Sequence, residues 1–484
     1  MLKTIITREF LDNILNFRFM IGLILCLIIT VACIIILTHD YQQELADYND
    51  RVNLHEEFLS KSATTRISVF QMTPRQKPPE RFRPLIIGIS DDEGSNSFDE
   101  NPLPILFPPL DFLFIVTIIM SLLAILFSYD AITSERQNGT LRLMIANSVS
   151  RPMILLGKFI GGATSLIIPF ILALVVGVLY INLNPNIQWD ASAWSELGLL
   201  TAASITFIML FYLLGLMVST FSRYSSTSIL NCLFLWVLLI LVIPNVCPYI
   251  SAQLRRVPSI RELERQEDEV KLAWIEEGTQ LQKEVVEQFR GKYGSLFSQF
   301  EALDKTDDRK KIQELAEADS QFKAMVDAFR GECAQVRRGR NSVLNKAMLK
   351  LGADLRTKAS AQTRLAKNMA AISPLADFVY VARDITGTGL RSLKYFGKAM
   401  YDYTERFGRY VSGVEAKVVS AHKDEPAPEG GWPLDIRDHP SFVFQEEPLK
   451  GKLDTVLPYW GILGLFNVVF FVGAFAGFMR YDVR

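Results

Sequence analysis

The sequence predicts an all-α membrane protein with six transmembrane helices and a large, mainly helical domain outside the membrane. Hydrophobic residues make up 49% of the 484 residues, and several apolar runs without an internal charge are long enough to cross a bilayer. Charged residues still reach 21%, which requires a sizeable polar domain besides the spans. The net charge of −1 provides no global field that attracts nucleic acid, so no nucleic-acid partner is expected.

The chain begins with an amphipathic stretch over residues 1–18. Its apolar side chains recur at helical spacing, with charged residues on the other faces. This pattern predicts an interfacial helix that lies along the membrane lipid on the cytoplasmic side. The first span follows over residues 19–37, and its apolar core is too long for a cleaved leader peptide.

Five further spans are predicted from apolar runs that contain no charge beyond their edges. They cover residues 110–128, 159–181, 197–218, 229–243 and 456–478. Short loops rich in Lys and Arg stay on the cytoplasmic side of a membrane. This rule places both termini, including the tail over residues 479–484, in the cytoplasm, and we expect a prokaryotic inner membrane.

The first polar region, residues 39–108, is expected outside the membrane. Tyr41–Ser60 is predicted to be a helix, and Thr65–Met72 and Pro84–Ile89 have the β-branched content of short strands. Ser441–Gln445, far along the chain, is expected to join this pair as a third strand. The fold class therefore includes a small β element.

The second polar region, residues 248–455, is predicted to be an extracytoplasmic helical domain. Ser259 followed by Glu262 forms a capping-box pattern at the start of a long helix. A second helix is expected from Thr306-Asp307 to Gly331, and a third from there to Ser373-Pro374, where proline ends it. Three long helices with polar outer faces are expected to pack as a bundle. Beyond them, the sequence Thr386-Gly387-Thr388-Gly389 predicts a helix break rather than a phosphate cradle.

Residues 130–158 form a short, basic segment between two predicted spans, and this places it in the cytoplasm. Gly139 is expected to end one helix in the left-handed conformation, and Thr140 to cap a new helix over Leu141–Ala146. Ser150 with Pro152 begins the next helix. The segment is therefore predicted to place a helix of one to two turns across the membrane face, with Leu141, Met144 and Ile145 on one side.

This segment resembles the coupling-helix region of the type-2 ABC exporter permeases. The resemblance is carried by Asp130, Glu135-Arg136, Gly139-Thr140-Leu141, Ser150-Arg151-Pro152 and Gly157-Lys158 in that order and spacing. It implies that the short helix binds a separate ATPase subunit. The residues implied in ATPase coupling are Glu135, Arg136, Gly139, Thr140, Leu141, Met144 and Arg151. The alternative is an ordinary cytoplasmic loop whose charges only set the topology.

The C-terminal half resembles the branch of the same superfamily that inserts a charged helical block before the last span. Ser373-Pro374, the Thr386–Gly389 break and the terminal sequence FMRYDVR carry this second resemblance. Simple members of the superfamily have no outer domain of this size, and the chain departs from them in that respect.

The resemblance implies the permease subunit of an ATP-driven exporter. The chain has no G-x-x-x-x-G-K-[ST] loop, so we expect it to be no enzyme by itself and to hold no cofactor. ATP and Mg would bind to the partner ATPase, present in two copies beneath two permeases that form a homo- or heterodimer. The alternative is a mechanotransmitter that uses ATPase motion to regulate or assemble an extracytoplasmic partner protein. A secondary transporter is disfavoured, because the predicted spans contain no acid or base for ion coupling.

Four polar residues interrupt the predicted spans. Polar side chains inside a membrane face either another helix or a water-filled cavity. Helix–helix contact and pathway lining are equally open for Thr117, Ser121, Asn231 and Asn467.

No metal or catalytic site is expected. His39 and His55 have only scattered carboxylates nearby, so surface histidines are favoured over metal ligands. The five cysteines include no CxxC pair, and free thiols are favoured over the one alternative, a Cys247–Cys333 disulfide.

Overall fold

The computed structural model describes residues 2–480 with several gaps. The gaps are residues 66, 68, 70–71, 74–76, 89–109, 147–148, 188, 307, 423–427 and 429–430. The predicted tail beyond Arg480 and much of the first polar region therefore lie outside the described residues.

The chain forms two compact units. One comprises Met1–Asn245 together with Ala370–Arg484, and the other comprises Val246–Met369. The predicted helical domain over residues 248–455 is thus divided, because residues 370–455 belong to the same compact unit as the spans and not to that of the long helices before them.

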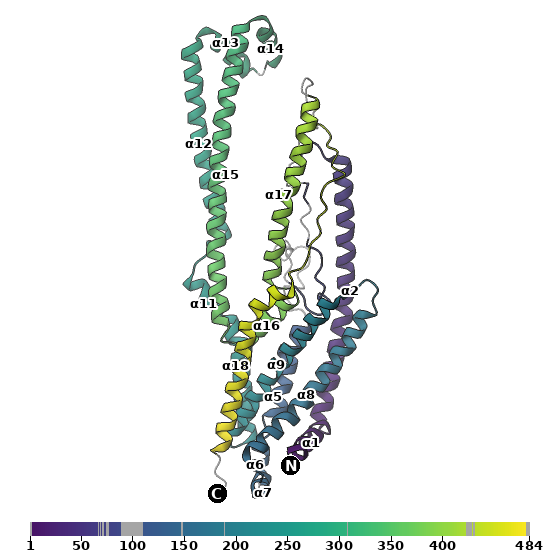
Figure 1. Cartoon of the computed structure of the whole chain (residues 1–484). Helices are drawn as coiled ribbons and strands as arrows, with labels where there is room; N and C mark the ends of the chain where they lie inside the picture. The colour runs from purple at the N-terminus through teal and green to yellow at the C-terminus, as the bar shows by residue number, and fades with distance from the viewer. Residues whose placement is uncertain are drawn as a thin grey trace. The chain divides into compact units, whose positions relative to one another are not determined.

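Within the described residues, six helical runs are long and apolar enough to cross a membrane. Each overlaps one of the spans predicted from the sequence, and they are drawn in Figure 1. The runs are α2 (Phe17–Ser62); Phe112–Gln137, made of α4 (Phe112–Phe114), η2 (Ile115–Met120), α5 (Ser121–Ser128) and α6 (Thr133–Gln137); α8 (Arg151–Asn182); α9 (Ala191–Phe221); Ser225–Leu254, made of α10 (Ser225–Trp236), η3 (Val237–Val242) and α11 (Ile243–Leu254); and α18 (Leu449–Met479).

Helix α9 is the centre of the first unit. It contacts α5, α8, α10 and α18, and its Phe207, Phe211 and Tyr212 side chains are fully buried. Because apolar residues face neighbours on nearly every side, α9 reads in the sequence as an unbroken apolar run rather than an amphipathic one.

A short helix, α16 (Pro374–Ile385), packs against α9 and α18. The Phe378 and Phe207 rings stack with centroids 4.8 Å apart. Ser373, just before α16, donates its hydroxyl hydrogen to the carbonyl of Leu239, inside the predicted fifth span. Asp377 on α16 is fully buried, and neither of its carboxylate oxygens has a hydrogen-bond partner among the described residues.

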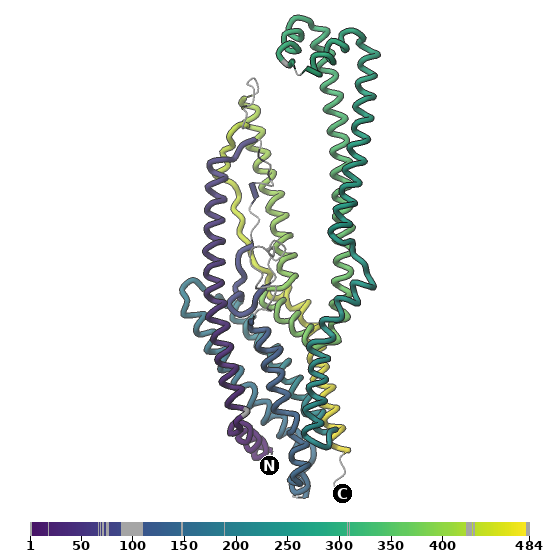
Figure 2. Tube along the Cα trace, turned by 180° about the vertical axis from the view of Figure 1, so that it is seen from behind, coloured from purple at the N-terminus to yellow at the C-terminus, as the bar shows by residue number. Residues whose placement is uncertain are grey.

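The helix α17 (Leu390–Ala421) lies beside the polar half of α2, where Leu59, Tyr403 and Phe407 form a small core. Both views show extended chain between these two helices (Figures 1 and 2). The predicted β element is wrong in the described residues: one isolated bridge, Thr64–Pro433, is present, and Ser441–Gln445 has no regular secondary structure. Aromatic side chains of the latter pack on α17 instead, as in the Phe396–Phe442 contact. Parts of the two other predicted strands, Thr65–Met72 and Pro84–Ile89, lie outside the described residues.

The second unit contains two long helices, α12 (Ile260–Tyr293) and α15 (Ser320–Ala370), joined by α13 (Ser295–Lys305) and α14 (Arg309–Ala318). Figure 2 shows the long pair side by side, with the short pair at one end. Phe297, Phe300 and Phe322 fill the core of that end.

The prediction of three long helices is therefore wrong. Gly331 lies inside α15, because a core that includes Met325 and Val326 outweighs the roughly 1 kcal/mol helix cost of a glycine. The real break is Gly294, whose φ of 51° favours glycine. The predicted cap at Ser259 is confirmed, since its side chain accepts a hydrogen bond from the Glu262 amide.

All five cysteines are free, including Cys247 and Cys333, which confirms the favoured prediction. No cluster of three or more metal-ligating side chains occurs in the described part of the chain, and His55 bonds to the carbonyl of Met72.

Candidate functional site

The short segment between the second and third spans lies at the end of the first unit that also holds α1 and the end of α18 (Figure 1). It consists of α6, the turn at Gly139, α7 (Thr140–Ala146) and the first turn of α8; we call it the coupling segment. Gly139 has φ +74°, which confirms the predicted left-handed turn. The prediction of Thr140 as the cap before the helix is wrong: Thr140 is the first residue of α7, and its hydroxyl donates to the carbonyl of Glu135. The predicted stop at Asn147 lies outside the described residues.

Leu141, Met144 and Ile145 share one face of α7, as predicted, and this face lies against the core of the protein itself. Leu141 is fully buried, and Met144 and Ile145 pack against the core of the first unit. The outward face carries Arg142 and Leu143, whose side chain is 65% exposed. The i, i+3, i+4 spacing therefore identified the apolar face correctly. In the structure this face packs against the core of the same chain and anchors the two-turn helix there.

The coupling segment is hydrogen-bonded to the end of α9. The Ile132 and Thr133 amides donate to Ser219 Oγ at 3.1 and 3.2 Å. Arg136 Nη1 donates to the carbonyl of Ser222 at 2.9 Å, directly after the last residue of α9. Three hydrogen bonds between side chains and main chain therefore fix the position of α6 on α9, and Arg136, which the resemblance implied in coupling, makes one of them.

Lys158 on α8 is buried between two glutamates that come from different helices. Its Nζ lies 2.8 Å from Glu135 Oε1 and 2.9 Å from Glu9 Oε2. Glu9 belongs to α1 (Leu2–Ile14), the predicted interfacial helix. We call Glu9, Glu135 and Lys158 the charge triad. It joins the N-terminal helix to the coupling segment, and the sequence does not reveal it because Glu9 is far along the chain from Glu135 and Lys158.

Two glycines of α8 allow α1 to approach closely. A methyl group on Gly157 would lie 2.5 Å from the Ile5 side chain, and one on Gly161 would lie 2.8 Å from Glu9. This spacing of small residues lets two helices pack at short range. Arg151, at the start of α8, donates to the carbonyl of Met479 at 2.6 Å and so connects the segment to the end of α18.

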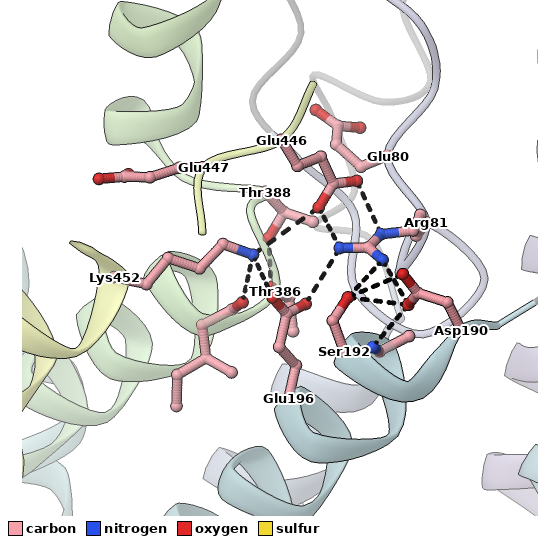
Figure 3. A network of polar contacts seen from close by, with 12 residues as sticks. Glu80, Arg81, Asp190, Ser192, Glu196, Thr386, Thr388, Glu446, Glu447 and Lys452 are labelled. Carbon is pink, nitrogen blue, oxygen red and sulfur yellow. Dashed lines mark hydrogen bonds and ion pairs between the residues drawn. The ribbon is translucent and has the colours of Figure 1, made fainter. Parts of the chain in front are cut away.

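A second polar cluster lies at the opposite end of α9 (Figure 3). We call it the ion network and define it as Arg81, Asp190, Glu196, Glu446 and Lys452. Arg81 makes a two-pronged contact with Glu446 at 2.9 and 2.6 Å and also reaches Asp190 at 2.8 Å. Lys452 Nζ lies 2.6 Å from Glu196 Oε1, and both side chains are almost completely buried.

The ion network joins three segments that are distant in the sequence, which contain Arg81, the start of α9, and Glu446 with Lys452. Lys452 also donates to the carbonyl of Ile385, which links α18 to the turn between α16 and α17. That turn contains Gly387 at φ +70°, which confirms a helix break at the predicted glycines. Asp190 caps α9, and its pKa is lowered by hydrogen bonds from the Ala193 amide and the Ser192 hydroxyl and by Arg81.

Next to the ion network, Arg391 of α17 binds Glu447 through two nitrogens, at 2.7 and 2.5 Å. The Arg391 hydrogen bonds lower the pKa of the Glu447 carboxyl. This pair fixes the start of α17 to the segment that leads into α18.

The four polar residues of the predicted spans have different positions. Ser121 accepts a hydrogen bond from the Trp236 indole and Asn467 donates to the carbonyl of Thr206, so both lie in helix–helix contacts. Thr117 donates to the carbonyl of Leu113 in its own helical run. Asn231 lines an open hollow of about 560 Å³ beside Ser222 and Arg223, at the end of α9 that holds the coupling segment.

Comparison with known proteins matches residues 3–331 to the family described as ABC-2 family transporter protein. This range contains the whole coupling segment and the charge triad. A 47-residue stretch is 47% identical to the probable ABC transporter permease protein NosY of Stutzerimonas stutzeri and 45% identical to the protein of that name from Pseudomonas aeruginosa. Each match covers 10% of this chain and 17% of the relative, so the chain spans about a sixth of those relatives. The family match extends over more than half of the sequence, and the chain belongs to the ABC-2 family of transporter proteins.

Proposed function

We propose that this multi-pass membrane protein is the permease subunit of an exporter and that a separate ATPase subunit binds the coupling segment in the cytoplasm. The observation that carries the proposal is the construction of α7. Leu141 anchors it to the core, while Arg142 and Leu143 face outward next to a turn set by Gly139. A surface of this kind is rigid and exposed, as a docking element requires.

The same contacts support a path by which motion of the docked ATPase would reach the other end of α9. Force on α7 would pass through the bonds of Ile132, Thr133 and Arg136 to the end of α9. Helix α9 has 31 residues and is therefore about 46 Å long. Its other end holds Glu196, which binds Lys452 of α18. A displacement of the coupling segment would thus reach the ion network through one continuous helix.

ATP and Mg belong to the partner ATPase in this proposal. Two ATPase copies would act beneath two permeases, with both chain termini in the cytoplasm of an inner membrane. This chain contributes a docking helix, its anchor and the route to the opposite end of α9; the nucleotide chemistry takes place on the partner.

Co-purification tests the proposal. The variant Leu143→Asp places a charge on the exposed face of α7, and we expect it to abolish recovery of the ATPase with the permease. The control Leu349→Asp changes an equally exposed leucine on α15 and should leave recovery unchanged. Equal recovery of the ATPase with wild type and Leu143→Asp would contradict the proposed docking surface.

A second candidate function, mechanotransmission to an outside partner, is supported by the Val246–Met369 unit. This unit has its own aromatic core and is compact by itself. Its two ends are adjacent, because Gln362 Nε2 donates to the carbonyl of Arg255 at 2.7 Å. Residues 259–358 can therefore be replaced by a short linker. Substrate efflux that survives this replacement favours export, and loss of partner binding without any efflux favours mechanotransmission.

A further inference from the structure

The end of the Val246–Met369 unit that continues the candidate span Ser225–Leu254 carries only positive charges. Residues 246–261 and 355–369 contain seven Lys or Arg and no Asp or Glu. We call this group the cationic collar: Arg255, Arg256, Arg261, Arg356, Lys358, Arg364 and Lys367. Between these two ranges the unit has charges of both signs, so the excess of positive charge is confined to the collar.

Hydrogen bonds join the two chain segments of the collar. Gln362 on α15 donates to the carbonyl of Arg255, and its own carbonyl accepts a hydrogen bond from the buried Ser251 hydroxyl at 2.9 Å. The last turns of α15 therefore lie against the end of α11, and the charges of both segments gather around that end.

The collar is poor in counter-ions from its own chain. Six of its seven side chains are exposed, Lys367 being the exception, and these six form no ion pair with any residue that the structure describes. Elsewhere in the same unit, Arg265 pairs with Glu269 and Arg290 with Glu301. Like charges held close together repel one another, and an external anion removes that repulsion.

Apolar side chains point outward immediately before the collar. Tyr249, Ile250 and Leu254 are 76%, 41% and 66% exposed, and Arg255 and Arg256 follow directly. An exposed aromatic and aliphatic surface that ends in arginines is typical of a helix leaving a bilayer, with the rings near the interface and the guanidinium groups at the phosphates.

We propose that the cationic collar binds the anionic headgroups of phospholipids in the leaflet at which α11 ends. A lipid fits better than an acidic protein, because the collar is continuous with the exposed apolar end of a candidate span. The lipid phosphates supply the missing counter-charge and fix the base of the Val246–Met369 unit at the membrane surface. This assignment does not depend on which partner drives the permease.

Titration with lipid tests the proposal on the full-length protein. The protein is placed in detergent–phosphatidylcholine micelles, phosphatidylglycerol is added, and the shift of the thermal unfolding midpoint is followed. The collar variant neutralises four exposed charges: Arg255→Gln, Arg256→Gln, Lys358→Gln and Arg364→Gln. The matched control neutralises four charges of α15 outside the collar: Arg337→Gln, Arg338→Gln, Lys346→Gln and Lys350→Gln. The double variant Lys358→Gln/Arg364→Gln, with two surface changes, covers the case in which the collar variant fails to fold.

Each basic residue near an anionic surface contributes about fivefold to binding, so the collar variant, which loses four, should need on the order of several hundredfold more phosphatidylglycerol for half of the shift. The double variant should change in the same direction by a smaller factor, and the control should titrate like wild type. High salt should weaken the wild-type response. Wild-type behaviour of both the collar and double variants, or an equal change in the control, would overturn the proposal. An equal shift with inorganic phosphate alone would also overturn it, because it would indicate a free-anion site.

Discussion

Lys158 Nζ lies 2.8 Å from Glu135 Oε1, and this contact connects the body of a candidate span to the helix that precedes the coupling turn. The same ammonium binds Glu9 of α1. The lysine side chain is 4% exposed, whereas Glu9 and Glu135 keep 17% and 21% exposure. One buried cation therefore orders two elements that the sequence places more than a hundred residues apart.

Replacing Lys158 alone should destabilise the protein strongly. Lys158→Met leaves Glu9 and Glu135 close together without their cation, and breaking such a pair costs on the order of 3 kcal/mol. The thermal unfolding midpoint in detergent measures the loss. Adding Glu9→Gln and Glu135→Gln to Lys158→Met removes the uncompensated charges and should recover most of it. A triple variant as unstable as the single one would contradict the role assigned to these charges.

Replacing Gly139 should destabilise the protein, because its turn requires a left-handed backbone. Gly139→Ala meets no atom within 4 Å, so its cost is only the left-handed backbone, roughly 1–2 kcal/mol. Gly139→Pro should be worse, because proline fixes φ near −65°. Gly291→Ala is the matched control: it also meets no atom, and it lies inside α12, where alanine stabilises a helix. An equal fall of the unfolding midpoint in Gly139→Ala and Gly291→Ala would contradict the left-handed conformation assigned to Gly139.

The ion network should behave as a buried pair. Glu196→Gln removes the carboxylate that Lys452 contacts and should lower the unfolding midpoint well beyond the effect of a surface change. The exchange Glu196→Lys with Lys452→Glu restores opposite charges and should recover part of the loss. Wild type, Glu196→Lys alone, Lys452→Glu alone and the double exchange form a double-mutant cycle, and a coupling energy near zero would show that the two residues act independently.

The Arg391–Glu447 pair should give a stability difference that depends on pH. The pKa of Glu447 is lowered in the folded protein, so the pair stabilises above the ordinary carboxyl pKa and loses this effect as pH falls through the lowered value. The midpoint difference between wild type and Glu447→Gln should therefore be large at pH 7 and should shrink on acidification. The exposed pair Asp435–Arg437 provides the control, with Asp435→Asn expected to change the midpoint little at pH 7. A Glu447→Gln difference that is constant from pH 7 to acid would contradict this assignment.

Local patterns predicted the helices and their ends well. Apolar runs located all six candidate spans, and glycine and serine signals located the turns at Gly139 and Gly387 and the cap at Ser259. These features depend on a few neighbouring residues, and the physics that sets them is local.

Long-range contacts were not predictable in the same way. Periodicity predicted that Leu141, Met144 and Ile145 share one face of α7, but it did not show that the protein's own core covers this face and buries Leu141. The β element failed because Ser441–Gln445 meets aromatic side chains of α17 and not a strand. The charge triad and the ion network each join charges from distant segments, and no spacing rule connects Glu9 with Lys158 or Glu196 with Lys452.

The most direct test of the account is photo-crosslinking between the coupling segment and the ATPase. A photoreactive amino acid at Leu143, on the exposed face of α7, should give an adduct of this permease with the ATPase in intact cells. The same amino acid at Leu349 on α15, expected on the other side of the membrane, should give none. An ATPase adduct from Leu349, or no ATPase adduct from Leu143, would contradict the central claim that α7 is the docking helix.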